Sequence, residues 1–302
     1  MRACACACVR SHACVCARMR PRGLPGEDVA GRGRRPASAL AMREAQALGV
    51  DLRAACVVSW SGGKDCNLAL LRAWREPSLE VRALCVFRPP RAAFRAHPLA
   101  LMEAQARALG LPLLHAVVDA EAHAGSYEAA YIAALEGLHR EHGIAVVASG
   151  DMDLVGTMPR NWLTQCCEAC SPPMRAFLPL WGADREGVLR ELLDQGVEPV
   201  FSCVKSPFFD ASWIGRKLDA SAVEEMKIKR SSGVGSDEAG LDLCGERGEY
   251  HTMVVDGPLY ARPVDAASGR AVELVGEKGQ PEGQRWWVLQ LPLGPEGEAL
   301  ER

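Results

Sequence analysis

The sequence of 302 residues has no long apolar run, no strong excess of one charge and no internal repeat. Because no apolar stretch free of charge reaches about 18 residues, a membrane-spanning helix is not expected. The formal net charge of −3 gives no global attraction to nucleic acid or to anionic lipid, so neither is expected as a partner. What remains is an ordinary balance of 48% hydrophobic and 24% charged residues, which indicates a globular protein of one large domain or two modest ones.

The sequence also lacks the cysteine pattern of a secreted disulfide framework. Five of the 13 cysteines lie in the first 16 residues, and the others are scattered. Several of the scattered ones, such as Cys56 and Cys85, stand inside apolar runs, where a cysteine usually behaves as a small buried hydrophobe. This usage favours a reducing compartment, so a cytoplasmic location is expected.

Residues 1–50 differ from the rest of the chain. Alanine and cysteine alternate there, and five arginines precede the first acidic residue, Glu27. A disordered or wrongly assigned extension, with Met42 as an alternative start, and an organelle transit peptide both fit this composition. A metal-binding tract around His12 is a third interpretation, although Cys-x-Cys-x-Cys without a second spaced pair is not a standard zinc spacing.

From residue 54 onward, short apolar runs alternate with helical patterns. Strands are predicted at residues 54–60, 81–87, 113–118 and 144–148, and helices at residues 64–75, 98–109, 127–142 and 159–170. Gly110 and Gly143 follow two of these helices as stop signals. Strands that alternate with helices indicate parallel βαβ units in a doubly wound, mainly parallel α/β sheet. Burial of both sheet faces explains why the strands are continuous apolar runs.

The alternation loosens past residue 180. A helix is expected at residues 184–195 and strands at 197–204, 250–255 and 286–291, with a Ser- and Gly-rich loop at 231–240. We therefore divide the chain into an extension (1–50), a larger α/β domain (51–180) and a smaller C-terminal α+β domain (181–302).

A glycine turn between the first strand and the first helix predicts a phosphate site. Residues 57–66 read Val-Val-Ser-Trp-Ser-Gly-Gly-Lys-Asp-Cys. Glycines let the backbone approach an anion closely, and the following helix offers free N–H groups and the positive end of its dipole. Lys64 adds a mobile charge. The segment is not a Walker A loop, which needs a longer glycine spacing and a Lys-Ser/Thr end. A tight turn without a ligand is the alternative.

The Ser-Gly-Gly-x-Asp order resembles the pyrophosphate-binding loop of the N-type ATP pyrophosphatases, or PP-loop enzymes. These enzymes split ATP between its α and β phosphates, usually to adenylate an oxygen of the substrate. The resemblance implies a Rossmann-like fold and makes residues 51–180 the nucleotide-binding domain. The family pattern ends in Ser, whereas this chain has Cys66, and a thiol is a weaker hydrogen-bond donor than a hydroxyl. That departure puts one phosphate contact in doubt.

Two later segments carry further candidate residues. Asp151 follows the fourth predicted strand, and the carboxyl end of a parallel strand is where such folds place ligand groups. It would hold Mg²⁺ or the nucleotide, or else act as an ordinary turn or capping aspartate. Glu246, Glu249 and His251 lie within six residues on a glycine-rich turn. Two carboxylates and an imidazole can bind a metal, orient an amine or take a proton, and a solvated acidic turn is the alternative.

Taken together, the motifs resemble the diphthine–ammonia ligase family in order and spacing. The segments that carry this similarity, besides the phosphate loop, are residues 149–151, 160–162 with Cys167, 178–182, 213–219, 244–252 and 256–259. The most specific is Gly-Glu-x-Gly-Glu-Tyr-His-Thr at 245–252. The similarity covers about residues 55–260.

The resemblance implies ATP-dependent amidation of diphthine, the modified histidine of translation elongation factor 2. The diphthine carboxylate would attack the α-phosphate of ATP, and ammonia would attack the acyl-adenylate, with release of AMP and pyrophosphate. ATP and Mg²⁺ are the implied cofactors. The implied nucleotide contacts are Ser61, Gly62, Gly63, Lys64, Asp65, Cys66, Gly150 and Asp151, with Asp65 and Asp151 at the metal. The implied catalytic residues are Lys64, Glu246, Glu249 and His251.

Three alternatives remain at this point. The chain resembles equally well, in its phosphate loop, an amide-forming or adenylating enzyme with a small-molecule acceptor. A tRNA thiolase would use cysteines such as those of residues 166–170, although the net charge argues mildly against nucleic acid. A nucleotide sensor without turnover is the third, which the change to Cys66 keeps open.

Overall fold

The computed structural model describes residues 53–90, 97–154, 158–233, 240–266, 269–274 and 284–291. The predicted extension at residues 1–50 lies outside these ranges, as does most of the predicted loop at 231–240. Within the described part of the chain, no helix is both long and apolar enough to cross a membrane.

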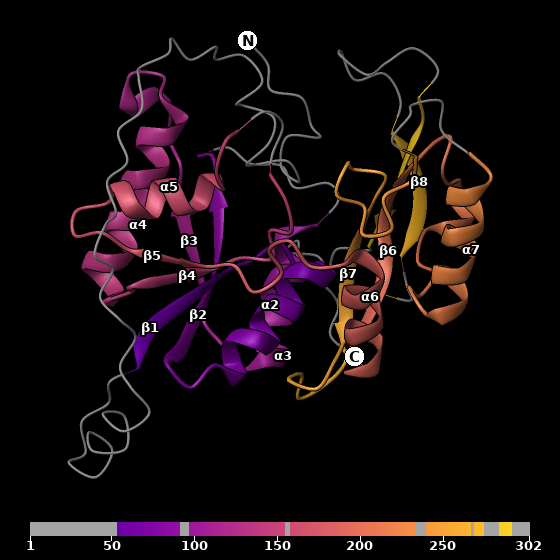
Figure 1. The fold of residues 1–302 in the computed structure, drawn as a ribbon, viewed down its shortest axis with the longest axis horizontal. Coiled ribbons are helices and arrows are strands. Elements are labelled where there is room, and N and C mark those ends of the chain that lie inside the picture. The colour runs from indigo at the N-terminus through magenta and orange to yellow at the C-terminus, as the bar shows by residue number, and fades with distance from the viewer. Residues whose placement is uncertain are drawn as a thin grey trace.

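The first sheet contains five parallel strands in the order β3-β2-β1-β4-β5 (Figure 1). The strands are β1 (Ala54–Ser59), β2 (Leu79–Arg88), β3 (Leu113–Val117), β4 (Val146–Ala148) and β5 (Arg175–Phe177). Every neighbouring pair is parallel. The order runs outward from β1 in one direction and from β4 in the other, so the predicted doubly wound α/β fold is confirmed, with its switch point between β1 and β4.

Helices cover both faces of this sheet. Alternate residues of β1 point to opposite faces, and both sets are apolar and buried. Cys56 and Val58 pack with α2 (Lys64–Arg75) and α3 (Leu99–Leu109), whereas Ala55 and Val57 pack with α4 (Tyr127–His142) and α5 (Trp162–Ala169). A short 3-10 turn, η3 (Glu121–His123), precedes α4. Burial on both faces is the physical reason that the strands are apolar throughout.

The predicted helix ends are confirmed where glycine closes them. Gly110 ends α3 at φ 67° and Gly143 ends α4 at φ 66°, in the left-handed conformation that glycine adopts without strain. The helix predicted at 159–170 is shorter than expected. It begins at Trp162 because the Asn161 side chain accepts a hydrogen bond from the Thr164 backbone N–H and caps it there.

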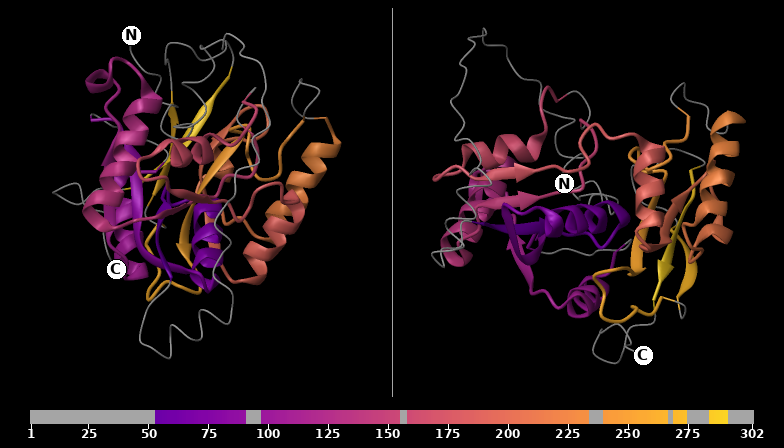
Figure 2. Two further views of the ribbon diagram at one scale, coloured as in Figure 1. Left: turned by 60° about the vertical axis from the view of Figure 1, so that its left-hand side comes forward. Right: turned by 60° about the horizontal axis from the view of Figure 1, so that its bottom comes forward.

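The second sheet is antiparallel, in the order β7-β6-β9-β8. Its strands are β6 (Glu198–Lys205), β7 (Tyr250–Asp256), β8 (Arg270–Leu274) and β9 (Trp286–Gln290). Helices α6 (Arg185–Asp194) and α7 (Ala220–Ser231) lie on one face of it (Figure 2), and a 3-10 turn, η4 (Ala211–Trp213), joins their core. The expected α+β character of this part is confirmed, whereas α7 and β8 were not predicted.

Helices α2 and α3 lie between the two sheets and contribute to the cores of both (Figure 1). On α2, Leu70 packs with the first sheet, while Leu68 belongs to the cluster around β6 and β7. On α3, Met102 faces the first sheet and Leu101 packs with Met253 and Leu289 of the second. Strand β7 packs beside the amino-terminal end of α2, where the Thr252 hydroxyl accepts a hydrogen bond from the Lys64 backbone N–H.

Candidate functional site

The phosphate loop connects the carboxyl end of β1 to the first turn of α2, as predicted. Ser61 is exposed, Gly62 and Gly63 are buried, and α2 begins at Lys64. Gly62 has φ +78°, and a Cβ there would lie 2.4 Å from Oε1 of Gln105. The positive φ favours glycine at this position, and an added Cβ would also displace the Gln105 side chain.

The side chain of Gln105, on α3, holds this loop in place by hydrogen bonds. Its Nε2 donates to the carbonyl oxygens of Gly62 at 3.0 Å and Val254 at 2.8 Å, and its Oε1 accepts from the Trp60 indole at 3.2 Å. The Val254 backbone N–H also donates to the Gly62 carbonyl at 2.9 Å. Gln105 is completely buried. Sequence reasoning missed it because its partners lie in two segments far from it along the chain, at Trp60 and Gly62 and at Val254.

Cys66 stands where the PP-loop pattern has Ser, and it remains part of the loop. Its thiol donates to the Gly63 carbonyl at 3.2 Å, and the Ser61 hydroxyl donates to its sulfur at 3.6 Å. Burial raises the pKa of the Cys66 thiol, although the Ser61 hydroxyl and the N–H groups of Ser61 and Gly62 act in the opposite direction. A buried neutral thiol thus fills the first turn of α2.

Gly150 and Asp151 meet the phosphate loop at the switch point of the sheet. A Cβ on Gly150 would lie 2.6 Å from the carbonyl carbon of Asp65, so only glycine lets β4 and α2 approach this closely. Asp151 accepts hydrogen bonds from the Ser149 hydroxyl at 2.7 Å and from Asn161 Nδ2 at 2.9 Å. The carboxylates of Asp65 and Asp151 are both partly exposed here, at the ligand-binding end of a doubly wound sheet.

Lys64 is held in place, which corrects the expectation of a mobile charge. Its side chain is 4% exposed, and its ammonium donates to both Asp65 oxygens, at 2.8 and 2.7 Å, and to the Cys244 carbonyl at 2.5 Å. Burial alone would lower the pKa of Lys64, but the Asp65 carboxylate raises it well above its usual value. Lys64 therefore joins the phosphate loop to the glycine-rich turn of the second sheet.

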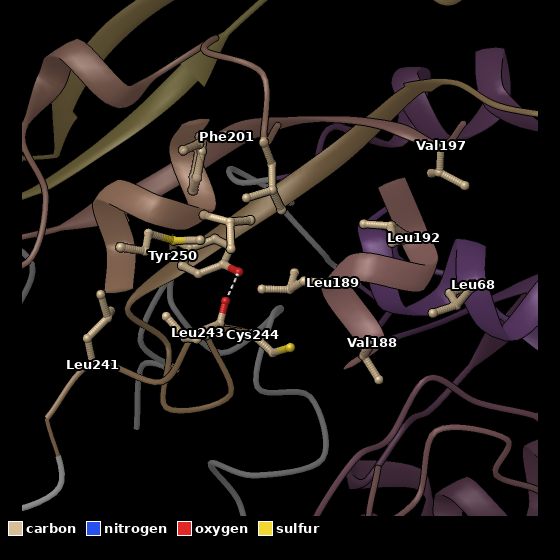
Figure 3. Packing of buried hydrophobic residues seen from close by; sticks show 14 of the residues in the cluster. Leu68, Val188, Leu189, Leu192, Val197, Phe201, Leu241, Leu243, Cys244 and Tyr250 are labelled. Atoms are coloured by element: carbon tan, nitrogen blue, oxygen red, sulfur yellow. Dashed lines mark hydrogen bonds between the residues drawn. The ribbon is translucent and has the colours of Figure 1, made fainter. Parts of the chain in front are cut away.

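That turn, residues 242–249, is fixed by Glu249. The side chain is 1% exposed, and its two oxygens accept from the backbone N–H groups of Asp242 at 2.8 Å and Arg247 at 3.0 Å. Tyr250 adds a hydrogen bond from its hydroxyl to the Leu243 carbonyl at 2.6 Å, above a packed core (Figure 3). These contacts place Glu249 inside the turn, and its catalytic role stays a prediction.

Glu246 is the exposed carboxylate of the same turn. The protein around it displaces solvent and lies near the charges of Asp65, Lys64 and Arg185. This desolvation and the Asp65 carboxylate raise the pKa of Glu246, while Lys64 and Arg185 oppose the shift. Glu246 is thus a carboxylate of increased basicity at the border between the two halves of the chain.

His251, the last of the predicted catalytic residues, lies half-buried on β7 beside a histidine that sequence reasoning missed. Its ring makes an edge contact with His97, with centroids 6.2 Å apart and planes at 64°. His97 is 5% exposed and immediately precedes the capping residue of α3. Its Cε1 lies 3.8 Å from the position that a Cβ on Gly63 would take. Only the folded arrangement of α3 against the loop reveals it.

The residues predicted from separate motifs therefore gather around one helix end. Thr252 accepts a hydrogen bond from the Lys64 backbone N–H at 3.1 Å across 188 positions of sequence. The described residues contain no group of three or more His, Cys, Asp or Glu side chains arranged to hold a metal ion. Mg²⁺ needs no such group beside a nucleotide, because one or two carboxylates and phosphate oxygens suffice. Asp65 and Asp151 match that donor set.

Both parts of the chain match models of one known family. Residues 54–171 match the family model described as the diphthamide synthase N-terminal domain, and residues 184–281 match its C-terminal domain. Human diphthine–ammonia ligase is 27% identical over 94 residues, which cover 31% of this chain and 33% of the human protein. The chain thus spans about a third of the length of this relative in the match.

The chain is also similar to solved structures. One of them is described as a predicted subunit of tRNA methyltransferase from Methanocaldococcus jannaschii. The two share 16% sequence identity with a TM-score of 0.37, over 68% of this chain and 98% of the other.

Proposed function

The chain belongs to the diphthamide synthase family, and from that premise we propose that it is an ATP-dependent ligase that forms a C–N bond. Its acceptor is the carboxylate of diphthine on translation elongation factor 2, and its nitrogen donor is ammonia. The observation that carries the proposal is the meeting of three motifs at the amino-terminal end of α2. These are the phosphate loop, Gly150-Asp151 after β4, and the turn that leads into β7.

The chemistry needs activation because a carboxylate resists attack by an amine. Attack of a diphthine carboxylate oxygen on the α-phosphate of ATP forms an acyl-adenylate and breaks the bond to pyrophosphate. Ammonia then attacks the acyl carbon, AMP leaves with the bonding electron pair, and loss of a proton gives the amide. The protein must therefore stabilise charge on the leaving pyrophosphate and accept one proton from the nitrogen.

The first of these tasks falls to the loop between β1 and α2. Gly62 supplies the positive φ that the turn needs, and the dipole at the amino-terminal end of α2 favours negative charge beside the loop. Asp65 and Asp151 would hold Mg²⁺, which neutralises charge on the phosphates. Lys64 acts indirectly, by holding the Asp65 carboxylate and the Cys244 carbonyl, because its ammonium donates to both.

The second task falls to the turn and to β7. Glu246 has an exposed carboxyl group whose pKa is raised, by desolvation first and then by Asp65, and a more basic carboxylate accepts a proton more readily. His251 is partly exposed on β7, and its ring makes an edge contact with that of His97. We assign Glu246 and His251 to the ammonia and acceptor side, with Glu249 holding the turn that presents them.

The cysteines do not support the tRNA-thiolation alternative. Cys166, Cys167 and Cys170 are 3% exposed or less. Burial raises the pKa of Cys167 to about 12 and of Cys170 to about 11, so neither is a thiolate at neutral pH. The buried free thiols are also compatible with the cytoplasm, where we place the reaction.

The test is pyrophosphate release from Mg-ATP by the full chain. Four acceptors are compared with and without ammonium: elongation factor 2 that carries diphthine, the unmodified factor, tRNA and small carboxylic acids. Release that requires the diphthine form, with incorporation of ¹⁵N from ammonium into the factor, supports the proposal. Release with small acids alone identifies a metabolite ligase instead. If none of the four acceptors supports pyrophosphate release, the proposal is contradicted.

A further inference from the structure

A buried histidine whose Nδ1 has no hydrogen-bond partner among the described residues lies beside the phosphate loop. This residue is His97, which is 5% exposed. Leaving a buried polar nitrogen unpaired costs free energy, so such a group calls for an explanation. The contact with His251 does not supply one, because rings with centroids 6.2 Å apart at 64° meet edge to face without a hydrogen bond.

The position of the ring points to the occupant. Its Cε1, the carbon between Nδ1 and Nε2, lies 3.8 Å from where a Cβ on Gly63 would stand. Gly63 is the residue directly before α2, a helix of 12 residues whose amino-terminal end favours an anion. The ring edge that carries Cε1 and the unpaired Nδ1 therefore lies near the amino-terminal end of α2. The Thr252 carbonyl oxygen and the Ser61 hydroxyl border the same position, at 3.2 and 3.6 Å.

The charge state of the imidazole agrees with a hydrogen-bonding role. Burial lowers the pKa of His97 to about 4, so the ring is neutral at physiological pH. A neutral imidazole carries one N–H, and the tautomer protonated at Nδ1 can donate to an anionic oxygen. A bound phosphate would thus satisfy the nitrogen that the protein leaves unpaired.

We propose that His97 is a phosphate-binding residue, whose Nδ1–H donates a hydrogen bond to a phosphate oxygen of the nucleotide held at the loop. The proposal rests on the nucleotide site of the proposed function but not on the identity of the acceptor. It adds a residue from the segment before α3 to a site otherwise built from the ends of β1 and β4 and from β7.

Amide substitutions test which ring nitrogen matters. His97→Asn places an amide near the position of Nδ1, His97→Gln places it nearer that of Nε2, and His97→Phe removes both donors. Binding of Mg-pyrophosphate, of adenosine and of an ATP analogue with a methylene bridge between the α and β phosphates is measured by calorimetry. His115→Asn, on the exposed side of β3, is the matched control.

The expected result separates the two amides. His97→Gln and His97→Phe should weaken pyrophosphate and analogue binding roughly five- to tenfold, the loss of one hydrogen bond. His97→Asn should stay within about threefold of the wild type, and adenosine binding should not change. The thermal midpoint of the ligand-free proteins reports separately on any structural damage.

Several outcomes would overturn the proposal. Equal binding by all the proteins, or equal weakening by Asn and Gln together with a lower thermal midpoint, removes the phosphate contact. A change confined to adenosine and the analogue would assign His97 to the nucleoside. If the wild type binds neither pyrophosphate nor the analogue, this proposal and the proposed function fail together. Normal His97-dependent binding without amidation of diphthine would remove the proposed function alone.

Discussion

The Thr252 hydroxyl accepts a hydrogen bond from the backbone N–H of Lys64 at 3.1 Å, so the second sheet caps the helix that follows the phosphate loop. Thr252 is 3% exposed, and its replacement by Val keeps the shape but removes the acceptor. The buried N–H would then be unpaired, and we expect the free energy of unfolding to fall by about 1–3 kcal/mol. Denaturant titration measures this change.

Thr252→Ser is the control for that experiment, because it keeps the hydroxyl and loses only a methyl group. Its stability should stay closer to the wild type than that of Thr252→Val. Indistinguishable midpoints for Thr252→Val and the wild type would show that the capping bond contributes nothing to stability.

Gly150→Ala tests the close contact between β4 and α2. The new Cβ would lie 2.6 Å from the carbonyl carbon of Asp65, a backbone atom that cannot swing away. We expect a loss of about 1–3 kcal/mol in unfolding free energy, as for other overpacked sites, and weaker binding of Mg-ATP.

Gly137→Ala is the matched control, since this glycine lies within α4 and its nearest new contact would be 3.7 Å away. Alanine is favoured over glycine in a helix, so the same substitution there should raise stability by about 0.5–1 kcal/mol. Equal effects of the two substitutions would contradict a steric role for Gly150.

Glu249→Gln separates a structural from a catalytic carboxylate. Both oxygens accept backbone N–H groups, and the NH₂ of glutamine cannot accept one of them. We expect an unfolding free energy lower by about 1–3 kcal/mol, with a fall in turnover that follows the loss of the turn. The stability curve and the pH profile of turnover are measured together.

Glu246→Gln is its counterpart on the exposed side of the same turn. This variant should keep its stability and lose turnover, if Glu246 takes the proton. Unchanged turnover in Glu249→Gln would remove a catalytic role for Glu249, and unchanged turnover in Glu246→Gln would remove one for Glu246.

The pKa of His97 predicts a pH dependence of stability. Burial lowers it from 6.5 to about 4, so the folded protein holds a neutral ring while the unfolded chain takes up a proton below about pH 6.5. The stabilisation is therefore full above about pH 6.5 and is lost as the pH falls toward about 4. Compared with His97→Asn, the wild type should lose on the order of 2–3 kcal/mol more across this window.

Urea titrations at several pH values measure that difference. Both proteins retain His251, the aromatic neighbour of His97, so its contribution is common to the two curves. Parallel curves for the wild type and His97→Asn would contradict a buried neutral His97.

The sequence was informative where local chemistry decides the structure. The helix Tyr127–His142 was predicted at its full length because Gly143 marks its end. Three elements were missed for physical reasons. Strand β5 has only three residues, β8 alternates between exposed and half-buried positions, and α7 carries an exposed Ile228 that obscures its apolar face. The Asp219 cap before α7 was a signal that was available.

The site residues divide in the same way between those in a contiguous motif, which were predicted, and those brought together by packing, which were not. Ser61, Gly62 and Gly63 are contiguous, so their pattern was visible without a structure. Gln105 and His97 reach the loop only through the packing of α3, and no local pattern indicates such contacts. Lys64 was assigned a mobile charge, although its ammonium donates to the adjacent Asp65 carboxylate and to the Cys244 carbonyl. The carbonyl contact has no sequence signature.

Helix α2 is shared between two hydrophobic cores, which makes the chain difficult to divide. Leu70 is buried against the first sheet and Leu68 against the second. A fragment that ended near residue 180 would leave Leu68 facing water, and the complementary fragment would expose the side of its sheet that this helix covers. Separately expressed halves should therefore aggregate alone and regain solubility when produced together. The two sheets would then unfold together in one cooperative transition. A distortion of the second sheet would reach the phosphate loop through α2.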